Sequence, residues 1–271
     1  MSTVCLDGFG IDAKSPEGLS LCVCAILAEY PNDLQYHGNE HYRKVFFHMV
    51  RLLSKHNQLF KDTNRMLSKE SIVQSLIAAC IHDLGHEGGD NMRDGVYTPG
   101  FMEQKAFDVS KPYLQKCGLD EDLIGEIETI VFCTDITFFA GDNSPCIRMK
   151  KIFKYYFWDE DVGDASLMMM GKLRRYVDNP RLSQMAMLLH EADIGTSAGL
   201  SYEQTKNETI NIMEERGLDS AGPRVVIAFL REQLGETMYT EAAKQTFGPA
   251  MDGVIKSAEA DFENGVETFY E

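Results

Sequence analysis

The sequence has few basic residues for its length. Of its 271 residues, 26 are Lys or Arg and 42 are Asp or Glu, which gives a formal net charge of −16. Affinity for nucleic acids comes mainly from Lys and Arg that neutralise phosphates, and no long basic run occurs here. We therefore expect no nucleic-acid partner. A ligand that carries phosphate would need local neutralisation, for example by metal ions.

The sequence also lacks a long hydrophobic run. The apolar stretch over residues 21–28 is far shorter than the roughly 20 residues that a membrane-spanning helix needs. The residues before it include Asp7, Asp12 and Glu17 but only Lys14 as a basic residue, whereas a secretory signal begins with positive charge. The pattern therefore predicts neither a membrane span nor an export signal.

Cysteine is not arranged for a disulfide framework or for zinc. The seven Cys are an odd number, and only Cys22 and Cys24 are near neighbours, at a spacing that zinc sites do not usually have. Several of the others lie in apolar stretches, as buried free thiols do. We therefore expect a reducing, cytoplasmic compartment.

Strand-like alternation is scarce, and helical periodicity dominates the sequence. Gly and Pro separate the periodic segments, and Gly118 and Gly217 directly follow helical runs, where a glycine often ends a helix. No internal repeat or long polar linker is visible. We predict a single all-α domain over residues 1–271, with about ten helices. The segments expected to be helical are residues 19–30, 41–55, 71–82, 102–117, 120–132, 148–157, 165–176, 181–193, 202–216, 225–243 and 250–268.

Four of the seven His form two pairs with i, i+4 spacing. The pairs are His37 with His41 and His82 with His86. Residues four apart lie on one face of a helix, about one turn from each other. On helices, each pair would therefore aim two imidazoles into the same cavity.

Two aspartates follow apolar runs that are typical of buried helices. Asp83 comes after residues 77–81, and Asp193 comes shortly after residues 185–189. An ionised Asp at the inner end of a buried helix is costly unless it is paired or bound to metal. Two His and two Asp from separate helices suit a divalent transition metal, and a carboxylate such as Asp83 can bridge to a second, harder ion. Each motif alone is more often a surface or core feature, so the prediction depends on their combination.

The order and spacing of these motifs resemble those of a known enzyme family. The similar segments are residues 36–41 (YHGNEH), 82–86 (HDLGH) with Asn91, 134–135 (TD), 190–193 (HEAD), 212–215 (IMEE) and 233–235 (QLG). Together they resemble the catalytic domain of class I cyclic-nucleotide phosphodiesterases, within the HD superfamily of metal-dependent phosphohydrolases. The resemblance implies a compact multi-helix fold with a metal centre in a deep pocket.

The resemblance also implies two divalent metal ions, zinc at the first site and magnesium or manganese at the second. The implied ligands of the first metal are His41, His82, Asp83 and Asp193, with Asp83 bridging to the second. A hydroxide between two cations is available as a nucleophile at neutral pH, because metal binding lowers the pKa of bound water. The implied reaction opens a 3′,5′-cyclic nucleotide, cAMP or cGMP, to the 5′-monophosphate.

The remaining implied roles concern proton transfer and the nucleotide. His37 would be the general acid that protonates the leaving 3′ oxygen, supported by a carboxylate that we assign to Glu103. His86 and Thr134 would contact the hydroxide or the waters of the second ion. The implied substrate-binding residues are Gln233, whose amide would face the purine, Ile212, which would line the base pocket, Asn91 and Thr134.

Two residues depart from the family pattern. Glu236 stands where the family has an aromatic that stacks on the base, and Thr196 stands where the family has Asn. Glu236 cannot stack, so the base preference is open. Two alternatives therefore remain at this point: an HD-type phosphohydrolase that acts on another nucleotide or small phosphoester, and a non-catalytic nucleotide-binding sensor.

Overall fold

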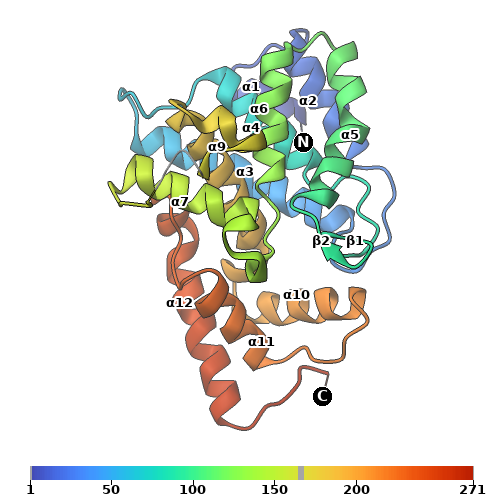
Figure 1. The fold of residues 1–271 in the computed structure, drawn as a ribbon, viewed down its shortest axis with the longest axis vertical. Helices are drawn as coiled ribbons and strands as arrows, with labels where there is room; N and C mark the ends of the chain where they lie inside the picture. The colour runs from blue at the N-terminus through green and yellow to red at the C-terminus, as the bar shows by residue number, and fades with distance from the viewer. Residues whose placement is uncertain (1, 164–167, 271) are drawn as a thin grey trace.

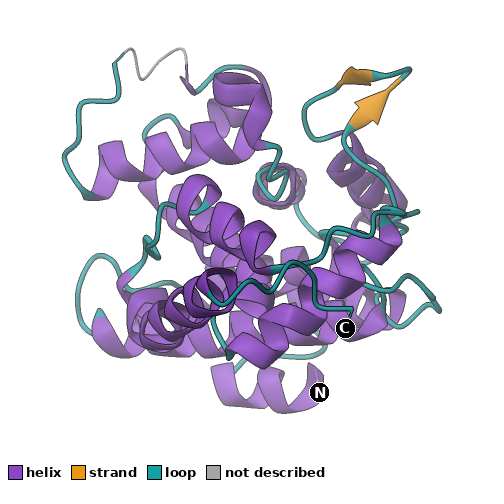
Figure 2. Ribbon diagram, turned by 90° about the horizontal axis from the view of Figure 1, so that it is seen from below, coloured by secondary structure: helices purple, strands orange, loops and turns teal. Residues whose placement is uncertain are grey.

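The computed structural model describes residues 2–163 and 168–270, and it is built almost entirely of helices (Figure 1). The all-α prediction is confirmed. The strands of the described residues form one small antiparallel hairpin of β1 (Met92–Arg93) and β2 (Val96–Tyr97), which lies at the edge of the helical body in Figure 2. None of the described helices combines the length and apolar character needed to cross a membrane.

The helices are α1 (Ser2–Phe9), α2 (Pro16–Leu27), α3 (Asn39–Leu59), α4 (Lys69–Ile81), α5 (Phe101–Lys116), α6 (Glu121–Phe132), η1 (Phe138–Asn143), α7 (Pro145–Phe157), η2 (Gly171–Tyr176), α9 (Pro180–Ala198), α10 (Tyr202–Glu215), α11 (Pro223–Ile227), η3 (Ala228–Gln233) and α12 (Glu241–Glu263).

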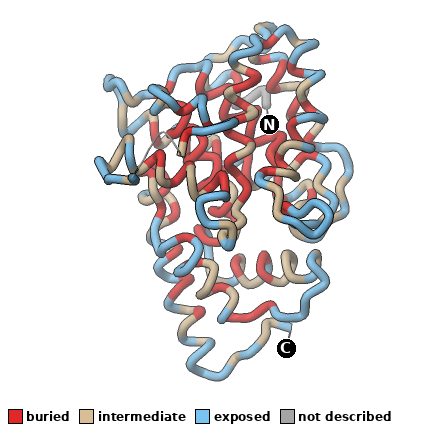
Figure 3. Tube along the Cα trace, in the orientation of Figure 1, coloured by how far each residue is buried: buried red, intermediate tan, exposed pale blue. Residues whose placement is uncertain are grey.

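The helices α3, α4 and α9 form the centre of the fold. Nearly every residue from the second turn of α4 onward, and most of α9, is buried, as expected for helices that are covered on all sides. α3 packs against both of them, while α2, α6 and α7 cover their outer faces. Figure 3 shows the buried residues concentrated in this part of the molecule. The start of α3, the end of α4 and the middle of α9 meet at one point.

The helices α10, α11 and much of α12 lie below this central group in Figure 1. α12 packs against α3 and α9, which attaches the lower part to the centre. The hydroxyl of Tyr202 donates a 2.8 Å hydrogen bond to Asp261, which connects α10 to α12. This arrangement holds the end of α10 against the segment that leads into α3.

The helix ends predicted from glycine are confirmed. Gly118 and Gly217 follow α5 and α10 with φ of 80° and 68°, in the left-handed region that glycine adopts without steric cost. Both residues end their helices by the mechanism expected from the sequence.

The prediction of one continuous helix over residues 225–243 is wrong. α11 continues into the short π-helical turn η3, and the chain then leaves the helical conformation until α12 begins. The buried carboxylate of Glu191 accepts hydrogen bonds from the backbone N–H groups of Tyr239 and Thr240. These bonds satisfy N–H groups that a continuous helix would pair internally. The side chain of Thr240 then caps the start of α12.

Three further boundaries differ from the expectation. The predicted helix over 165–176 begins in residues 164–167, which lie outside the described residues, and its end forms the short 3₁₀ helix η2. The segment expected over 250–268 belongs to α12, which runs through Pro249 and ends at Glu263. The N-terminal helix α1 was not expected.

Candidate active site

Three central helices deliver four side chains to one place. His41 lies in the first turn of α3, His82 caps the end of α4 with Asp83 beside it, and Asp193 lies within α9. His41 Nε2 lies 3.1 Å from Asp193 Oδ1 and 3.5 Å from Asp83 Oδ2. His82 Nε2 lies 3.1 Å from Asp83 Oδ2. The structure therefore brings together the four residues predicted to hold the first metal.

The donor atoms of this cluster fit a divalent cation. His82 Nδ1 lies 3.0 Å from the backbone oxygen of Ala79, which can only accept, so Nδ1 carries a proton and Nε2, which faces Asp83, is the nitrogen that could bind a cation after losing its proton. His41 Nε2 and His82 Nε2 lie near carboxylate oxygens, but neither forms a hydrogen bond of normal geometry with any described residue, although both side chains are buried. One ligand atom from each of His41, His82 and Asp193 lies within 4.8 Å of the others. Buried nitrogens without a partner, next to carboxylates, are the arrangement that a bound metal completes.

Without a cation, the carboxylates hold protons on the imidazoles. Burial alone would lower the pKa of His41, but the adjacent Asp193 and Asp83 raise it to about 10. Burial opposes ionisation of Asp83 as well, yet the neighbouring His82 and His41 hold its pKa well below the usual value. The cluster is therefore strongly polarised, with ionised carboxylates beside histidines that must lose protons to bind a metal.

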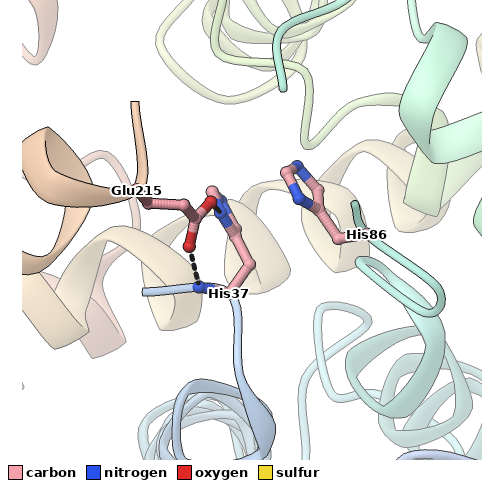
Figure 4. Close-up of side chains that lie close together, drawn as sticks. All are labelled: His37, His86 and Glu215. Atoms are coloured by element: carbon pink, nitrogen blue, oxygen red, sulfur yellow. Dashed lines mark hydrogen bonds and ion pairs between the residues drawn. The ribbon is translucent and has the colours of Figure 1, made fainter. Parts of the chain in front are cut away.

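A second cluster lies beside the first and contains His37, His86 and Glu215 (Figure 4). His37 Nδ1 lies 2.5 Å from Glu215 Oε1, and Glu215 Oε2 accepts 3.0 Å hydrogen bonds from the backbone N–H groups of Tyr36 and His37. The rings of His37 and His86 stack with centroids 3.9 Å apart and planes at 18°. The ring of His37 is 5.8 Å from that of His41, so the two clusters adjoin.

The electrostatics of the second cluster assign different states to its members. Burial would raise the pKa of Glu215, but the hydrogen bonds and charge of His37 lower it to about 2, so this carboxylate is ionised at neutral pH. Burial and the charge of His37 lower the pKa of His86 to about 4. The backbone N–H of Gly88 donates to His86 Nδ1 at 3.0 Å, which places the proton of the neutral ring on Nε2. His37 uses Nδ1 for Glu215 and keeps Nε2 available for a substrate.

The helical geometry predicted for the two histidine pairs is wrong, and the closest ring contact is across the pairs, between His37 and His86. His37 lies in a bend just before α3, because Gly38 is the N-cap of that helix. A Cβ at Gly38 would lie 2.5 Å from the backbone oxygen of Leu34, so only glycine allows the chain to approach itself here. His86 lies in the loop after α4, beyond a left-handed turn at Gly85 with φ of 72°.

The carboxylate that pairs with His37 is Glu215, whereas the sequence analysis placed Glu103 in that position. Glu103 is buried on α5, and its Oε1 accepts a 3.3 Å hydrogen bond from Asn91. Its Oε2 has no partner among the described residues. Burial and the charges of Asp135 and Asp83 raise its pKa well above the usual value. Glu215 belongs to the similar segment 212–215, but it was given no role there, because no local pattern pairs it with a histidine 178 residues away.

The predicted substrate-binding residues lie in different settings. Ile212 is half-buried on α10, one turn before Glu215, and residues three apart share a helix face. Gln233 is exposed at the end of η3. The hydroxyl of Thr134 donates to the backbone oxygen of Val131 at 2.8 Å. Thus Ile212 shares a face with the second cluster, while Gln233 extends into solvent.

The amide of Asn91 is engaged within the protein. Its Oδ1 accepts a 2.8 Å hydrogen bond from the backbone N–H of Met102, and its Nδ2 donates to Glu103. Asn91 therefore orients Glu103 and fixes the start of α5. The structure shows these protein contacts for a side chain that the sequence analysis assigned to the substrate.

Comparisons with known proteins identify the fold. No protein-family model matches the chain, and no curated protein sequence matches it. Among solved structures, the chain is similar to a structure of the Leishmania phosphodiesterase LmjPDEB1 in complex with IBMX, with a TM-score of 0.59 and 14% sequence identity. The match covers 97% of this chain and 82% of the other. The two proteins therefore share the all-helical fold of a phosphodiesterase catalytic domain.

Proposed function

We propose that this chain is a metal-dependent phosphodiesterase that opens a 3′,5′-cyclic nucleotide to the 5′-monophosphate. The observation that carries the proposal is the contact between two clusters. One contains buried histidine nitrogens without partners beside two aspartates, and the other contains a histidine bound to an ionised carboxylate. Phosphodiester hydrolysis needs positive charge at the phosphoryl oxygens and an acid at the leaving oxygen. The fold shared with LmjPDEB1 supports the same proposal.

The side chains of His41, His82, Asp83 and Asp193 would hold the first of two divalent cations, with zinc there and magnesium or manganese at the second site. Asp83 lies close to both histidines and would be shared with the second cation. When bound, the cations would supply positive charge to the phosphoryl group and would lower the pKa of a water molecule, so that the water loses a proton and can attack phosphorus. Glu103 Oε2, which has no partner among the described residues, would accept a hydrogen bond from such a water.

His37 would protonate the leaving oxygen from Nε2. The attacking water gives up a proton to solvent as its oxygen bonds to phosphorus, the bond between phosphorus and O3′ breaks, and the electron pair of that bond remains on O3′. O3′ then takes the proton from His37 Nε2, and His37 regains a proton from solvent. Glu215 holds Nδ1, orients the ring and stabilises the positive charge that the imidazole carries before transfer. His86, stacked on His37, would keep the ring plane fixed.

The nucleotide would lie against the face of α10 that carries Ile212 and Glu215. Ile212 would form one wall of the base pocket, and Gln233 would reach the purine edge from η3. Thr134 and Asn91 would act from the opposite side, Asn91 through its hydrogen bond to Glu103.

A second candidate function is hydrolysis of another nucleotide or small phosphoester at the same site. Glu236 is exposed, adopts φ of 60° and forms a 2.9 Å ion pair with Arg231. It therefore offers no aromatic surface after Gln233, which favours a substrate whose recognition does not require base stacking at this position.

A substrate panel with two variants tests the proposal. The purified protein, supplied with Mn²⁺ or Mg²⁺ and Zn²⁺, is expected to hydrolyse cAMP or cGMP. Asp83→Ala is expected to lose metal and activity together, because it removes a ligand. His37→Ala is expected to retain metal and lose about 10²- to 10⁴-fold in kcat, the usual contribution of a general acid. Asp90→Ala removes an exposed carboxylate from a nearby loop and serves as the control.

Three results would contradict the proposal. Turnover of a phosphomonoester with none of either cyclic nucleotide would favour the second candidate. Tight nucleotide binding without product formation would contradict the catalytic activity. Full metal content in Asp83→Ala would contradict the assignment of the metal ligands on which the hydrolysis depends.

A further inference from the structure

Asn32 occupies the loop between α2 and α3, and its side chain contacts both loops that carry the paired histidines. Its Nδ2 lies 3.1 Å from the backbone oxygen of His37 and 3.3 Å from that of His86, which is 54 residues further along the chain. Its Oδ1 accepts a 3.1 Å hydrogen bond from the backbone N–H of Leu34. In the part of the chain that the structure describes, no other side chain donates to either histidine carbonyl.

The same amide also connects to the metal-ligand loop. Asn32 Nδ2 lies 3.3 Å from the hydroxyl of Tyr42, and that hydroxyl donates a 2.6 Å hydrogen bond to the backbone oxygen of Asp83. The two N–H groups of this half-buried amide are therefore shared among three acceptors, which links the loops of His37 and His86 to each other and, through Tyr42, to the backbone of Asp83. The stack of His37 on His86 depends on the relative position of these loops, because neither histidine belongs to a helix.

We propose that Asn32 is a positioning residue for the proton donor, holding His37 and His86 in their stacked arrangement. This inference rests on the proposed function of His37. Asn32 touches neither substrate nor metal ligand side chains. It acts by setting where Nε2 of His37 lies relative to the leaving oxygen, and displacements of about 1 Å at such a group can cost 10²-fold in rate.

The chemistry of the leaving group distinguishes positioning from general stability. The 3′ oxygen of a cyclic nucleotide leaves as an alkoxide and needs a proton, whereas p-nitrophenolate leaves as a stable anion without one. Displacement of His37 therefore slows hydrolysis of a cyclic nucleotide far more than hydrolysis of bis(p-nitrophenyl) phosphate. A loss of folded protein or of metal slows both reactions equally.

The test compares two variants at Asn32 with a matched control. Asn32→Ala removes the amide, and Asn32→Asp keeps an oxygen for Leu34 while placing negative charge against the two carbonyls. Both are expected to lower kcat on the cyclic nucleotide about 10- to 100-fold, with less than about 3-fold change on bis(p-nitrophenyl) phosphate and unchanged metal content. The control is Asn57→Ala. Asn57 is also half-buried and forms two 2.9 Å hydrogen bonds with the backbone of Leu67, outside both clusters.

A second readout does not need activity. In ¹⁵N-histidine NMR, the ring signal of His86, which stacks on His37, should be the same in the unaltered protein and in Asn57→Ala, and should shift in Asn32→Ala. Equal rate losses on both substrates, or an unchanged signal in Asn32→Ala, would overturn the positioning role. If the unaltered protein hydrolyses neither diester while the signal still depends on Asn32, the positioning stands and the proposed function fails.

Discussion

At the scale of single residues, the candidate site depends on which nitrogen of each histidine faces the protein. His82 donates from Nδ1 to Ala79, which leaves Nε2 as the nitrogen that could bind a cation. His37 also uses Nδ1 for the protein, but its partner is the ionised carboxylate of Glu215. Under the proposed function, the same orientation would give a metal ligand at one position and a proton donor at the other.

We predict that Glu215→Gln lowers kcat on a cyclic nucleotide about 10²-fold without loss of metal, because the amide cannot stabilise a charged His37. The pKa of Glu215 is lowered to about 2, so its stabilising charge is present above about pH 4.5 and is lost as pH falls toward 2. The neutral variant should therefore show a smaller loss of stability in that range. The measurements are steady-state kinetics, metal analysis and thermal unfolding against pH.

Glu214→Gln is the control for this prediction, since Glu214 is exposed and differs from its neighbour in facing solvent. The assignment of Glu215 fails if both variants behave alike.

At the scale of elements, α9 contacts two different parts of the fold through two acidic residues that are two positions apart. Asp193 faces the metal cluster, while Glu191 faces the segment between η3 and α12. Successive residues on a helix are rotated by about 100°, so residues two apart point in nearly opposite directions. The oxygens of Glu191 accept from the backbone of Tyr239 and from the backbone and hydroxyl of Thr240, which joins α9 to the start of α12.

We predict that Glu191→Gln makes the protein more stable at alkaline pH. Burial raises the pKa of Glu191 from 4.5 to about 7, despite hydrogen bonds from Thr240 and Tyr239 that lower it. Because the folded state holds this proton more tightly, stability is full below about pH 4.5 and falls as pH rises through 7. The free energy of unfolding of Glu191→Gln, relative to that of the unaltered protein, should therefore increase by about 3 kcal/mol between pH 4 and pH 8. Urea unfolding at both pH values measures it.

The exposed Glu232 provides a control for Glu191, because Glu232→Gln removes the same charge from the neighbouring turn without a buried environment. An equal pH response in both variants would show that burial of Glu191 is not the cause.

At the scale of the whole molecule, the candidate metal site of His41, His82, Asp83 and Asp193 joins the three central helices. His41 comes from α3, His82 from the end of α4 and Asp193 from α9. A cation bound there would be held by residues of all three helices, and these helices pack against one another in the core. Binding to the folded state alone stabilises a protein in proportion to the logarithm of ligand concentration.

We predict that chelation with EDTA lowers the melting temperature and that Zn²⁺ or Mn²⁺ restores it. At a free cation concentration about 100 times its Kd, the stabilisation is about 2.7 kcal/mol. For a chain of this size, that corresponds to a shift of roughly 5–10 °C. Differential scanning fluorimetry measures the shift, and Asp193→Ala should abolish it. A cation-dependent shift of full size in that variant would place the metal elsewhere.

The sequence by itself determined the local features of this protein. The all-helical class follows from the hydrophobic period, and the ends of α5 and α10 follow from glycines that adopt positive φ. The four candidate metal ligands were named through the resemblance of the ordered His and Asp motifs to a known family, and each of those motifs is itself local. All of these depend on residues within a few positions of one another.

Only the tertiary structure decided the pairings. The carboxylate beside His37 is 178 residues away, and the one that interrupts the helix predicted over 225–243 is 48 residues from Tyr239. Asn32 reaches His86 across 54 residues. Hydrogen bonds of this kind depend on which surfaces the core brings together. The packing of α3, α4 and α9 sets that arrangement, and the local sequence pattern does not predict it. The identities of the chemical groups were therefore readable in the sequence, and their partners were not.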